Sequence, residues 1–335
     1  MKILGIETSC DDTAVGIVED GRNIISNIVF SQADMHSEFG GIIPEVASRE
    51  HIVKIIPGIN KALNEARMNL NDIDAVSVTY GPGLAGSLLI GVNTAKSMAI
   101  ASGLPFIGIN HIEGHIYATC LEDIELKEKP GVPIISLVVS GGHTDLILMK
   151  GHGDFQIIAR SRDDAAGEVF DKVARVLGLG FPGGPEIQKI SESGNLLDPA
   201  FPRPKVKNSM DFSFSGLKTS LLRYVELNDG ELSQKMLSDI AASYQFAIVD
   251  ILLSKLRLAI DKTEIRVALI GGGVAANKLL REKADKDFID SKILYPNIEL
   301  CTDNAAMIAF LGEIYLKKKL NRCESYQVIP NLRLS

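Results

Sequence analysis

Two histidines four residues apart lie in the segment Asn110–His115, which reads NHIEGH. If a helix begins near His111, the side chains of His111 and His115 share one helical face, with Cβ atoms roughly 5–6 Å apart. Two neutral imidazoles at this separation can bind one metal ion. Two surface histidines are the alternative, but the pair directly follows a segment typical of a buried strand and makes up two of the six histidines in the chain. The sequence therefore favours a metal site.

The acidic residue of this segment indicates which metal chemistry to expect. A zinc protease of the H-E-x-x-H type needs a glutamate directly after the first histidine, where it polarises a metal-bound water. Here Ile112 occupies that position, and the acid is Glu113, one residue later. On a helix this displaces the carboxylate by about 100°, to a different face. Proteolysis by this mechanism is therefore not expected.

A third ligand must come from a distant part of the chain. Asp303, in the segment ELCTDNAAMIAF, stands at the expected N-terminus of a helix that follows a strand. Its carboxylate can either cap that helix or complete a metal site, and the sequence leaves both roles open. A site of two histidines and one aspartate with open coordination positions suits iron, zinc or manganese.

The elements that would position these residues form a repeated pattern. A chain of 335 residues is long enough for about two domains. Each half begins with strand, turn and strand and continues with strand, glycine turn and helix, which indicates an internal duplication. Such alternation implies α/β layers with mixed sheets and a ligand crevice between two similar lobes. The pattern is carried by residues 2–9, 13–20, 74–103, 133–150 and 265–284.

Three glycine-containing turns could approach a phosphate group: Gly81–Gly83, Ser140–Gly142 and Gly271–Gly273. Glycine lets backbone N–H groups come close to an anion, and a helix N-terminus adds a favourable dipole. None of the three matches a P-loop or a dinucleotide-binding fingerprint. One such turn alone would be interpreted as a simple tight turn, but three in matching places of a duplicated pattern predict anion binding.

Three acids flank the turn of the first predicted hairpin: Glu7, Asp11 and Asp12. An acid facing a bound phosphate repels it unless a cation or proton intervenes. This hairpin is therefore expected either to help hold a cation or to polarise a nucleophile, with a solvated loop as the alternative.

The bulk composition limits the classes of partner. The formal net charge of −7 argues against strong autonomous binding to nucleic acid, unless a partner protein supplies positive charge. The four cysteines are scattered, which is typical of reduced thiols in the cytoplasm. No apolar run is long enough to span a bilayer, and the first residues do not form a secretory signal, so we expect a cytoplasmic protein without membrane association.

The ordered motifs of the chain resemble a known family, the bacterial tRNA N6-adenosine threonylcarbamoyltransferases (TsaD subunit), formerly called O-sialoglycoprotein endopeptidases. The resemblance covers essentially the whole chain. It is carried by GIETSCDDTAVGIV, FGGIIPEVASREH, GPGLAGSLLIG, NHIEGH, LVVSGGHTDL, DDAAGEVFDKVARVLGLGFPGGP, FPRPK, DFSFSGLKTS, GGGVAANKLLR and CTDNAAMIA.

This resemblance implies an α/β protein with the actin-like ATPase (ASKHA) fold, in which two duplicated ribonuclease-H-like lobes enclose a central ligand crevice. We expect residues 1–109 plus 304–335 to form the N-terminal lobe. Residues 110–303 would form the C-terminal lobe, with the metal pair and most of the nucleotide site.

The resemblance also implies a reaction and its participants. The threonylcarbamoyl group of threonylcarbamoyl-AMP would pass to N6 of adenosine 37 in tRNAs that read codons beginning with adenine, and AMP would leave. One divalent metal ion per chain is expected, with iron favoured and zinc or magnesium as alternatives. The expected partners are tRNA, the donor or another adenine nucleotide, a paralogous dimerisation subunit (TsaB) and a small ATPase (TsaE).

The family's functional residues map onto this chain motif by motif. The metal ligands fall on His111, His115 and Asp303, and Asp11 is the candidate catalytic residue at the reacting end. Many family members carry an acid four residues after Gly184, whereas this chain has Gln188, which puts a ribose contact there in doubt. The substrate-binding positions are Val138, Val139, Ser140, Gly141, Gly142, Asp171, Gly184 and Asn277.

Three other functions compete with this one. An ATPase or a sugar-kinase-like phosphotransferase would share the fold, because a fold does not determine a function. A metalloendopeptidase is disfavoured by the position of Glu113, and a non-catalytic scaffold would be expected to lack the histidine pair. The basic residues expected to meet RNA are Arg160, Arg162, Lys172, Arg175, Arg203, Lys205 and Lys207.

Overall fold

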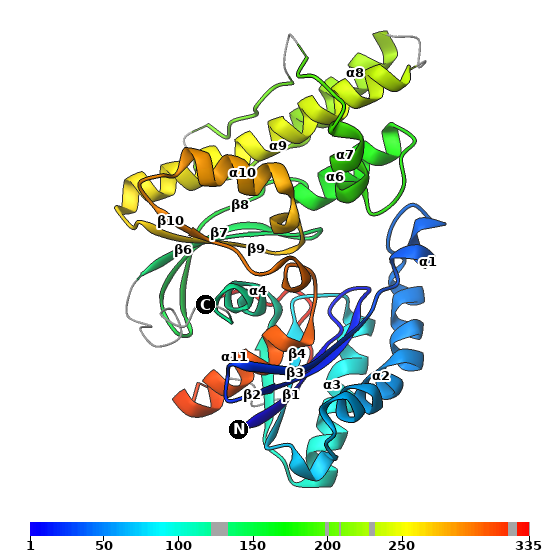
Figure 1. The fold of residues 1–335 in the computed structure, drawn as a ribbon, viewed down its shortest axis with the longest axis vertical. Coiled ribbons are helices and arrows are strands. Elements are labelled where there is room, and N and C mark those ends of the chain that lie inside the picture. The colour runs from blue at the N-terminus through cyan, green and yellow to red at the C-terminus, as the bar shows by residue number, and fades with distance from the viewer. Residues whose placement is uncertain (122–132, 198–200, 208, 228–231, 321–326, 335) are drawn as a thin grey trace. The chain divides into compact units, whose positions relative to one another are not determined.

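The structure, a computed structural model, describes residues 1–121, 133–197, 201–207, 209–227, 232–320 and 327–334. The chain divides into two compact units, which Figure 1 shows as ribbons. Unit 1 comprises Met1–Pro130 and Thr302–Ser335, and unit 2 comprises Gly131–Cys301.

Unit 1 is built on a five-stranded mixed sheet with the order β3-β2-β1-β4-β5. Strand β2 runs antiparallel to both of its neighbours, β1 and β3, whereas β4 and β5 run parallel to β1. The strands are β1 (Lys2–Glu7), β2 (Thr13–Glu19), β3 (Asn23–Phe30), β4 (Ala75–Gly81) and β5 (Phe106–Asn110).

Helices cover both faces of this sheet (Figure 1). Leu4 and Ile6 of β1 belong to the core beneath α2 and α3. Gly5, which points to the opposite face, lies against α11 so closely that a Cβ there would meet Ala309 N at 2.7 Å. The helices of unit 1 are α1 (Ala33–Ser37), α2 (Pro44–Ala66), η1 (Leu70–Asp72), α3 (Ala85–Ser102), α4 (His111–Cys120) and α11 (Ala305–Lys318).

Unit 2 has a second five-stranded sheet, with the order β10-β9-β6-β7-β8. From the β8 edge the order is β8-β7-β6-β9-β10, which corresponds strand by strand to β3-β2-β1-β4-β5 of unit 1. The parallel and antiparallel pairings are also the same in the two sheets. The internal duplication predicted from sequence is therefore confirmed. The strands are β6 (Ile134–Val139), β7 (Thr144–Gly151), β8 (Asp154–Arg160), β9 (Val267–Gly271) and β10 (Lys292–Leu294).

The helices of unit 2 surround a core in which α9 (Gln234–Thr263) is the longest element. By length and composition alone α9 could cross a membrane, but 72% of its most apolar stretch is buried inside the structure, as is usual for a core helix. The other helices are α6 (Ala166–Val176), α7 (Gly183–Ser191), α8 (Ser215–Leu227), η2 (Gly273–Ala276), α10 (Lys278–Asp287) and η3 (Ile298–Leu300).

The division into units differs from the lobe boundaries expected at residues 109/110 and 303/304. Helix α4 packs against α11, and both belong to unit 1. The histidine pair, which was expected in the C-terminal lobe, therefore lies in the same unit as the helix that follows Asp303.

Candidate metal centre

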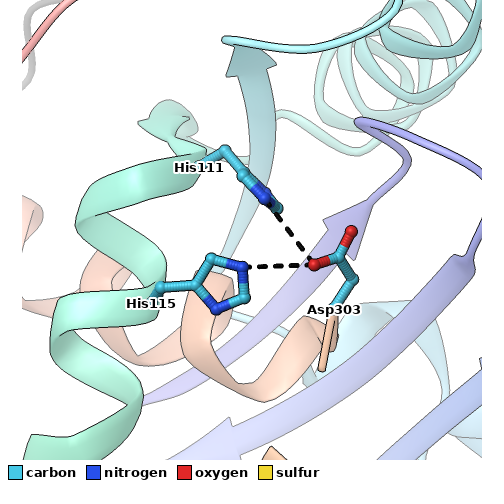
Figure 2. A group of neighbouring side chains, drawn as sticks. All are labelled: His111, His115 and Asp303. Atoms are coloured by element: carbon cyan, nitrogen blue, oxygen red, sulfur yellow. Dashed lines mark ion pairs between the residues drawn. The ribbon is translucent and has the colours of Figure 1, made fainter. Parts of the chain in front are cut away.

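His111, His115 and Asp303 converge in unit 1, as Figure 2 shows. One potential ligand atom from each residue lies within 4.8 Å of the others. Nε2 of His115 is 3.2 Å from Oδ1 of Asp303, and Nε2 of His111 is 3.6 Å from the same oxygen. Both histidine side chains are buried and that of Asp303 is partly exposed. The spacing of two histidines and one distant acid thus brings three ligand atoms together.

The local sequence explains why the two imidazoles share one face. Strand β5 passes directly into α4, whose N-cap is Asn110. The side-chain oxygen of Asn110 accepts hydrogen bonds from the backbone N–H groups of Ile112, at 2.9 Å, and Glu113, at 3.4 Å. This cap fixes the helix start at His111, so His115 follows one turn later, with ring centroids 4.7 Å apart.

Asp303 is not the cap of the helix it precedes. The N-cap of α11 is Asn304, whose Oδ1 accepts a hydrogen bond from Met307 N at 3.0 Å. The two roles left open by the sequence are thereby separated, because the neighbouring residue caps the helix while the carboxylate of Asp303 faces the histidines.

The acid of the NHIEGH segment takes part in helix packing. The carboxylate of Glu113 accepts a hydrogen bond from the hydroxyl of Tyr315 on α11. Gly114 lets α11 approach, because a Cβ there would lie 3.0 Å from Ile308 Cδ1. Glu113 therefore joins the helix that carries the histidines to the helix that follows Asp303, and it does not take the place of a protease's general base.

A buried network supports His111 from the side opposite Asp303. Nδ1 of His111 lies 3.0 Å from Oε2 of Glu7 and 3.1 Å from Oγ of Ser9. Burial disfavours the charged form of His111, yet the negative charges of Glu7 and Asp303 raise its pKa to about 9. Although burial also opposes ionisation of Glu7, His111 and the hydroxyl of Thr79 lower the pKa of that carboxyl overall.

The charge and the ligand atoms of the cluster suit a divalent cation. A proton on His111 partly balances Glu7 and Asp303, and a metal ion can replace it. Two imidazole nitrogens and one carboxylate oxygen are ligands that iron, zinc and manganese accept. The donor set and its charge therefore fit one divalent ion.

The turn between β1 and β2 adds further negative charge. Burial and the charge of Asp303 raise the pKa of Asp11, and burial, Asp303 and Asp11 raise the pKa of Asp12 to about 7. Oδ1 of Asp12 is buried and has no hydrogen-bond partner among the described residues. Burial and nearby acids raise the pKa of the Cys10 thiol well above its usual value, so this cysteine is a poor nucleophile.

His51 is a buried residue of this region that the sequence interpretation missed. It lies on α2, where its Nε2 donates to the backbone carbonyl of Cys10 at 2.9 Å and its Nδ1 lies 2.7 Å from the hydroxyl of Thr13. His51 thus fixes both ends of the turn that carries Asp11 and Asp12. The only sequence signal was that this histidine ends the motif FGGIIPEVASREH, one of those that carry the family resemblance.

The three glycine turns differ in what surrounds them. A Cβ at Gly81 would lie 2.1 Å from the carbonyl oxygen of Ile329. A Cβ at Gly83 would lie 2.4 Å from the carbonyl oxygen of Ser9. The glycines of this first turn are therefore explained by close packing against neighbouring backbone. Their presence no longer requires that the turn approach a phosphate. Likewise Gly272, with φ +89°, lies against Val139, where a Cβ would be 2.4 Å from the carbonyl oxygen.

The turn Ser140–Gly142 is open. A Cβ at Gly141 or Gly142 would meet nothing within 4 Å. The turn is nevertheless fixed, because Ser140 N donates to His143 O at 2.9 Å and Gly167 N donates to Ser140 O at 3.1 Å. Gly141 and Gly142 are exposed, whereas Gly81, Gly271 and Gly272 are buried. The preceding Val138 and Val139 are buried, so only their backbone could contact a substrate.

The remaining predicted substrate residues lie near the N-termini of helices in unit 2. Oδ1 of Asp171 accepts a hydrogen bond from Gly183 N at 2.7 Å, and a Cβ at Gly184 would meet nothing within 4 Å. Asn277 caps α10 by accepting from Leu280 N at 3.0 Å and also donates to Gln245 at 2.8 Å. These contacts give Asp171 and Asn277 structural roles alongside any role in binding.

Gln188, the departure from the family pattern, binds the start of α10. Its Oε1 accepts a hydrogen bond from Lys278 N at 2.8 Å. A neutral amide can therefore satisfy the helix end at this position.

The predicted basic residues are partly neutralised. Arg162 pairs with Asp211 at 2.5 Å, Lys172 with Asp164 at 2.7 Å and with Glu168, and Arg203 with Asp250 at 3.1 Å. These three are therefore weaker candidates for RNA contacts than their charge alone suggested.

Comparison with known proteins gives a consistent result. A family model described as TsaD: tRNA N6-adenosine threonylcarbamoyltransferase matches residues 23–310. A protein of that name from Dehalococcoides mccartyi is 52% identical over 314 residues, which cover 93% of each chain. Another, from Thermosipho africanus, is 46% identical over 337 residues and covers 100% of both chains.

Solved structures with low sequence identity share the fold. HypF from T. kodakarensis superposes with a TM-score of 0.62 at 15% identity, covering 95% of this chain and 48% of that one. The activator of the 2-hydroxyisocaproyl-CoA dehydratase from Clostridium difficile gives a TM-score of 0.57 at 15% identity, covering 97% and 99%. The actin-like ATPase fold expected from the sequence is thereby confirmed.

Proposed function

The chain belongs to the tRNA N6-adenosine threonylcarbamoyltransferase family, and we propose that it transfers threonylcarbamoyl from threonylcarbamoyl-AMP to N6 of adenosine 37 in tRNA. The tRNAs would be those that read codons beginning with adenine, and AMP would be released. The proposal is supported by the family match over residues 23–310 together with the His-His-Asp cluster.

One divalent ion per chain would be held by Nε2 of His111, Nε2 of His115 and the carboxylate of Asp303. Iron is favoured by the family resemblance, with zinc and magnesium as the alternatives; the two imidazoles suit iron or zinc better than magnesium. When bound, the ion supplies positive charge that can neutralise phosphate oxygens and stabilise a leaving AMP.

The side chains of the acid turn would act at the reacting end of the donor. Attack by the N6 amine on the carbamate carbonyl breaks the bond to the phosphate oxygen and releases a proton. Asp11 is our candidate for interacting there, because its burial raises its pKa and makes it a better proton acceptor than an ordinary aspartate. No covalent intermediate on the enzyme is required, which agrees with the raised pKa of the Cys10 thiol.

The residues of unit 2 would bind the nucleoside part of the donor. The open turn Ser140–Gly142 offers backbone N–H groups without side-chain obstruction. Asp171 would accept from ribose hydroxyls, Gly184 would allow close approach, and Asn277 would contact the ribose or base with the hydrogen-bonding capacity its cap leaves unused. Val138 and Val139 would contribute backbone contacts only.

Partner proteins are part of the proposal. A formal net charge of −7 is unfavourable for binding tRNA alone. Helix α2 exposes Ile52, Val53 and Ile56 by 59%, 60% and 53%, and α3, which packs beside it, exposes Leu89. Such apolar exposure supports contact with another protein, for which the paralogous dimerisation subunit (TsaB) is proposed. We also propose the small ATPase (TsaE) as a partner and a cytoplasmic location, both from the family role.

A reconstituted transfer assay tests this function. Threonylcarbamoyl-AMP, tRNA and the partner proteins would be combined with the wild-type chain, with His111→Ala, or with His152→Ala as a matched control from the β7–β8 turn. We expect His111→Ala to lose transfer by about 100-fold or more while staying folded, since one metal ligand is gone, and His152→Ala to retain it.

The transfer assay, together with assays of ATP turnover and of glycoprotein cleavage, distinguishes the rival functions. Unchanged product yield with His111→Ala would remove the metal from the mechanism. ATP turnover by the chain without its partners, and no modified adenosine with them, would favour a phosphotransferase of the same fold. Cleavage of a glycoprotein that stops on adding a chelator would restore the peptidase alternative.

A further inference from the structure

Glu7, at the end of β1, is a carboxylate in an unusual environment. Its exposed fraction is 0%. In the part of the chain that the structure describes, His111 is the only basic side chain paired with it. Removing a carboxylate from water costs several kcal/mol unless hydrogen bonds compensate, so the position of Glu7 must be explained by the groups that it contacts.

Three donors surround this carboxylate. Ser9 N–H donates to Oε1 at 2.5 Å, and the hydroxyl of Thr79 donates to Oε2. Nδ1 of His111 lies 3.0 Å from Oε2. An ionised carboxylate only accepts hydrogen bonds. With both oxygens engaged by donors, Nδ1 of His111 must carry a proton.

The proton on Nδ1 determines what the other ring nitrogen can do. In a neutral imidazole with hydrogen on Nδ1, Nε2 carries the lone pair. Nε2 of His111 is the atom that lies 3.6 Å from Oδ1 of Asp303. The hydrogen bond to Glu7 therefore selects the tautomer whose lone pair is directed toward the cluster.

His115 provides a contrast within the same cluster. Its Nε2 also faces Asp303, at 3.2 Å, but among the described residues its buried Nδ1 has no hydrogen-bond partner. Only one of the two imidazoles thus has its remote nitrogen bound by a side chain. The orientation of His111 is fixed by β1, on the far side of the ring from Asp303.

We propose that Glu7 is a positioning residue that holds His111 in the tautomer and orientation required for metal binding. This inference rests on the metal site proposed above and adds a carboxylate behind one of its ligands. Carboxylates that accept from the remote nitrogen of a metal-bound histidine fix the ring and increase its basicity. A purely structural role, in which Glu7 only shapes the β1–β2 turn through Ser9, is the alternative.

Zinc affinity separates the two roles. The full chain would be stripped with a chelator and titrated with Zn²⁺ in competition with a chromophoric chelator, comparing wild type, Glu7→Gln and Glu313→Gln. Glu313 is a matched control, because it is also a buried acid of unit 1 but pairs with Lys317. We expect Glu7→Gln to raise the Kd for zinc by about 10–100-fold and Glu313→Gln to leave it unchanged.

The outcomes are distinguishable. Equal zinc affinity of wild type and Glu7→Gln would overturn the role of Glu7 alone, whereas less than one zinc per wild-type chain would overturn the metal site and this inference with it. Unfolding in the presence of chelator shows whether Glu7→Gln is folded. If it is not, two other variants test the inference. Thr79→Val removes one donor but keeps the carboxylate and its bond to His111, so it must retain near wild-type zinc affinity. Glu7→Asp shortens the reach to Nδ1 of His111 and must weaken zinc binding.

Discussion

The first two strands of each sheet are joined by turns that occupy equivalent places in the duplicated topology, yet the two turns differ in chemistry. In unit 1, β1 ends at Glu7 and the turn that follows carries Asp11 and Asp12 beside a histidine cluster. In unit 2, β6 ends at Val139 and the turn Ser140–Gly142 presents uncovered glycines. One turn concentrates charge, whereas the other exposes backbone.

The fifth strands differ in the same way. Strand β5 leads without a loop into α4, so that two histidines are placed on a capped helix. Strand β10 is only three residues long and is followed by the short helix η3. The duplicated scaffold therefore supplies equivalent positions in the two units. Local side chains make those of unit 1 suitable for a cation, whereas the open turn of unit 2 suits the close approach of a ligand.

The largest expected effect is the loss of zinc affinity when Asp303 is replaced, compared with replacement of its neighbour Asn304. Asp303→Ala removes a ligand and should weaken zinc binding by more than about 100-fold, beyond the loss typical of a residue behind a ligand. Asn304→Ala removes the cap of α11 and should cost about 1 kcal/mol of unfolding free energy while zinc binding remains. Zinc titration and denaturant unfolding of both variants measure this; an equal loss of zinc affinity in both would contradict the separation.

The second prediction contrasts the packed and open glycine turns. Gly83→Ala should destabilise the chain by about 2–3 kcal/mol, because its Cβ would lie 2.4 Å from Ser9 O. Gly141→Ala should change the unfolding free energy by less than about 0.5 kcal/mol but raise the KM for the donor. Equal stability of the two variants would show that the turns do not differ in packing.

A third prediction concerns the link between α4 and α11. Tyr315→Phe removes the hydroxyl that donates to the buried side chain of Glu113. We expect a loss of about 1–3 kcal/mol in unfolding free energy, as for a buried acceptor that loses its donor, with a smaller loss of zinc affinity than in Glu7→Gln. Thermal unfolding and the zinc titration provide the measurement, and full retention of stability would show that the bond contributes nothing.

The last prediction is a pH dependence that the charged turn should show. The folded-state pKa of Asp12 is raised from 3.8 to about 7, so between these values the folded chain retains a proton that the unfolded chain has released. The contribution of Asp12 to stability therefore falls as pH rises through this window. In chelator-treated protein, Asp12→Asn should stabilise relative to wild type more at pH 8 than at pH 5; the same gain at both values would contradict the shift.

Several elements could be predicted from the sequence because their signals are local. The first hairpin was predicted from two strands around a polar turn, and residues 74–103 were predicted to form a strand, a glycine turn and a helix. Strand β3 was missed, because the segment Asn23–Phe30 has mixed burial and a register shift where it pairs with β2. Strand β10, with three residues, is too short to give a periodic signal.

The three ligand residues of the site were predictable from the sequence, but the residues that hold them in place were not. The spacing of His111 and His115 and the acid at position 303 named the cluster, whose three ligand atoms the structure brings within 4.8 Å of one another. The contacts of Glu7 with His111 and of Glu113 with Tyr315 join residues 104 and 202 positions apart. No spacing rule connects residues so distant.

The sequence by itself determined the duplicated α/β pattern, the capped helix that aligns two imidazoles and the family to which the chain belongs, because these depend on neighbouring residues or on ordered motifs. Only the tertiary structure decided that Asn304 rather than Asp303 caps α11, that the Gly81–Gly83 turn is filled by Ile329 and Ser9, and that Glu7 lies behind His111. Each of these depends on which chain segments pack together, and that choice is made by burial of the whole core rather than by any local preference.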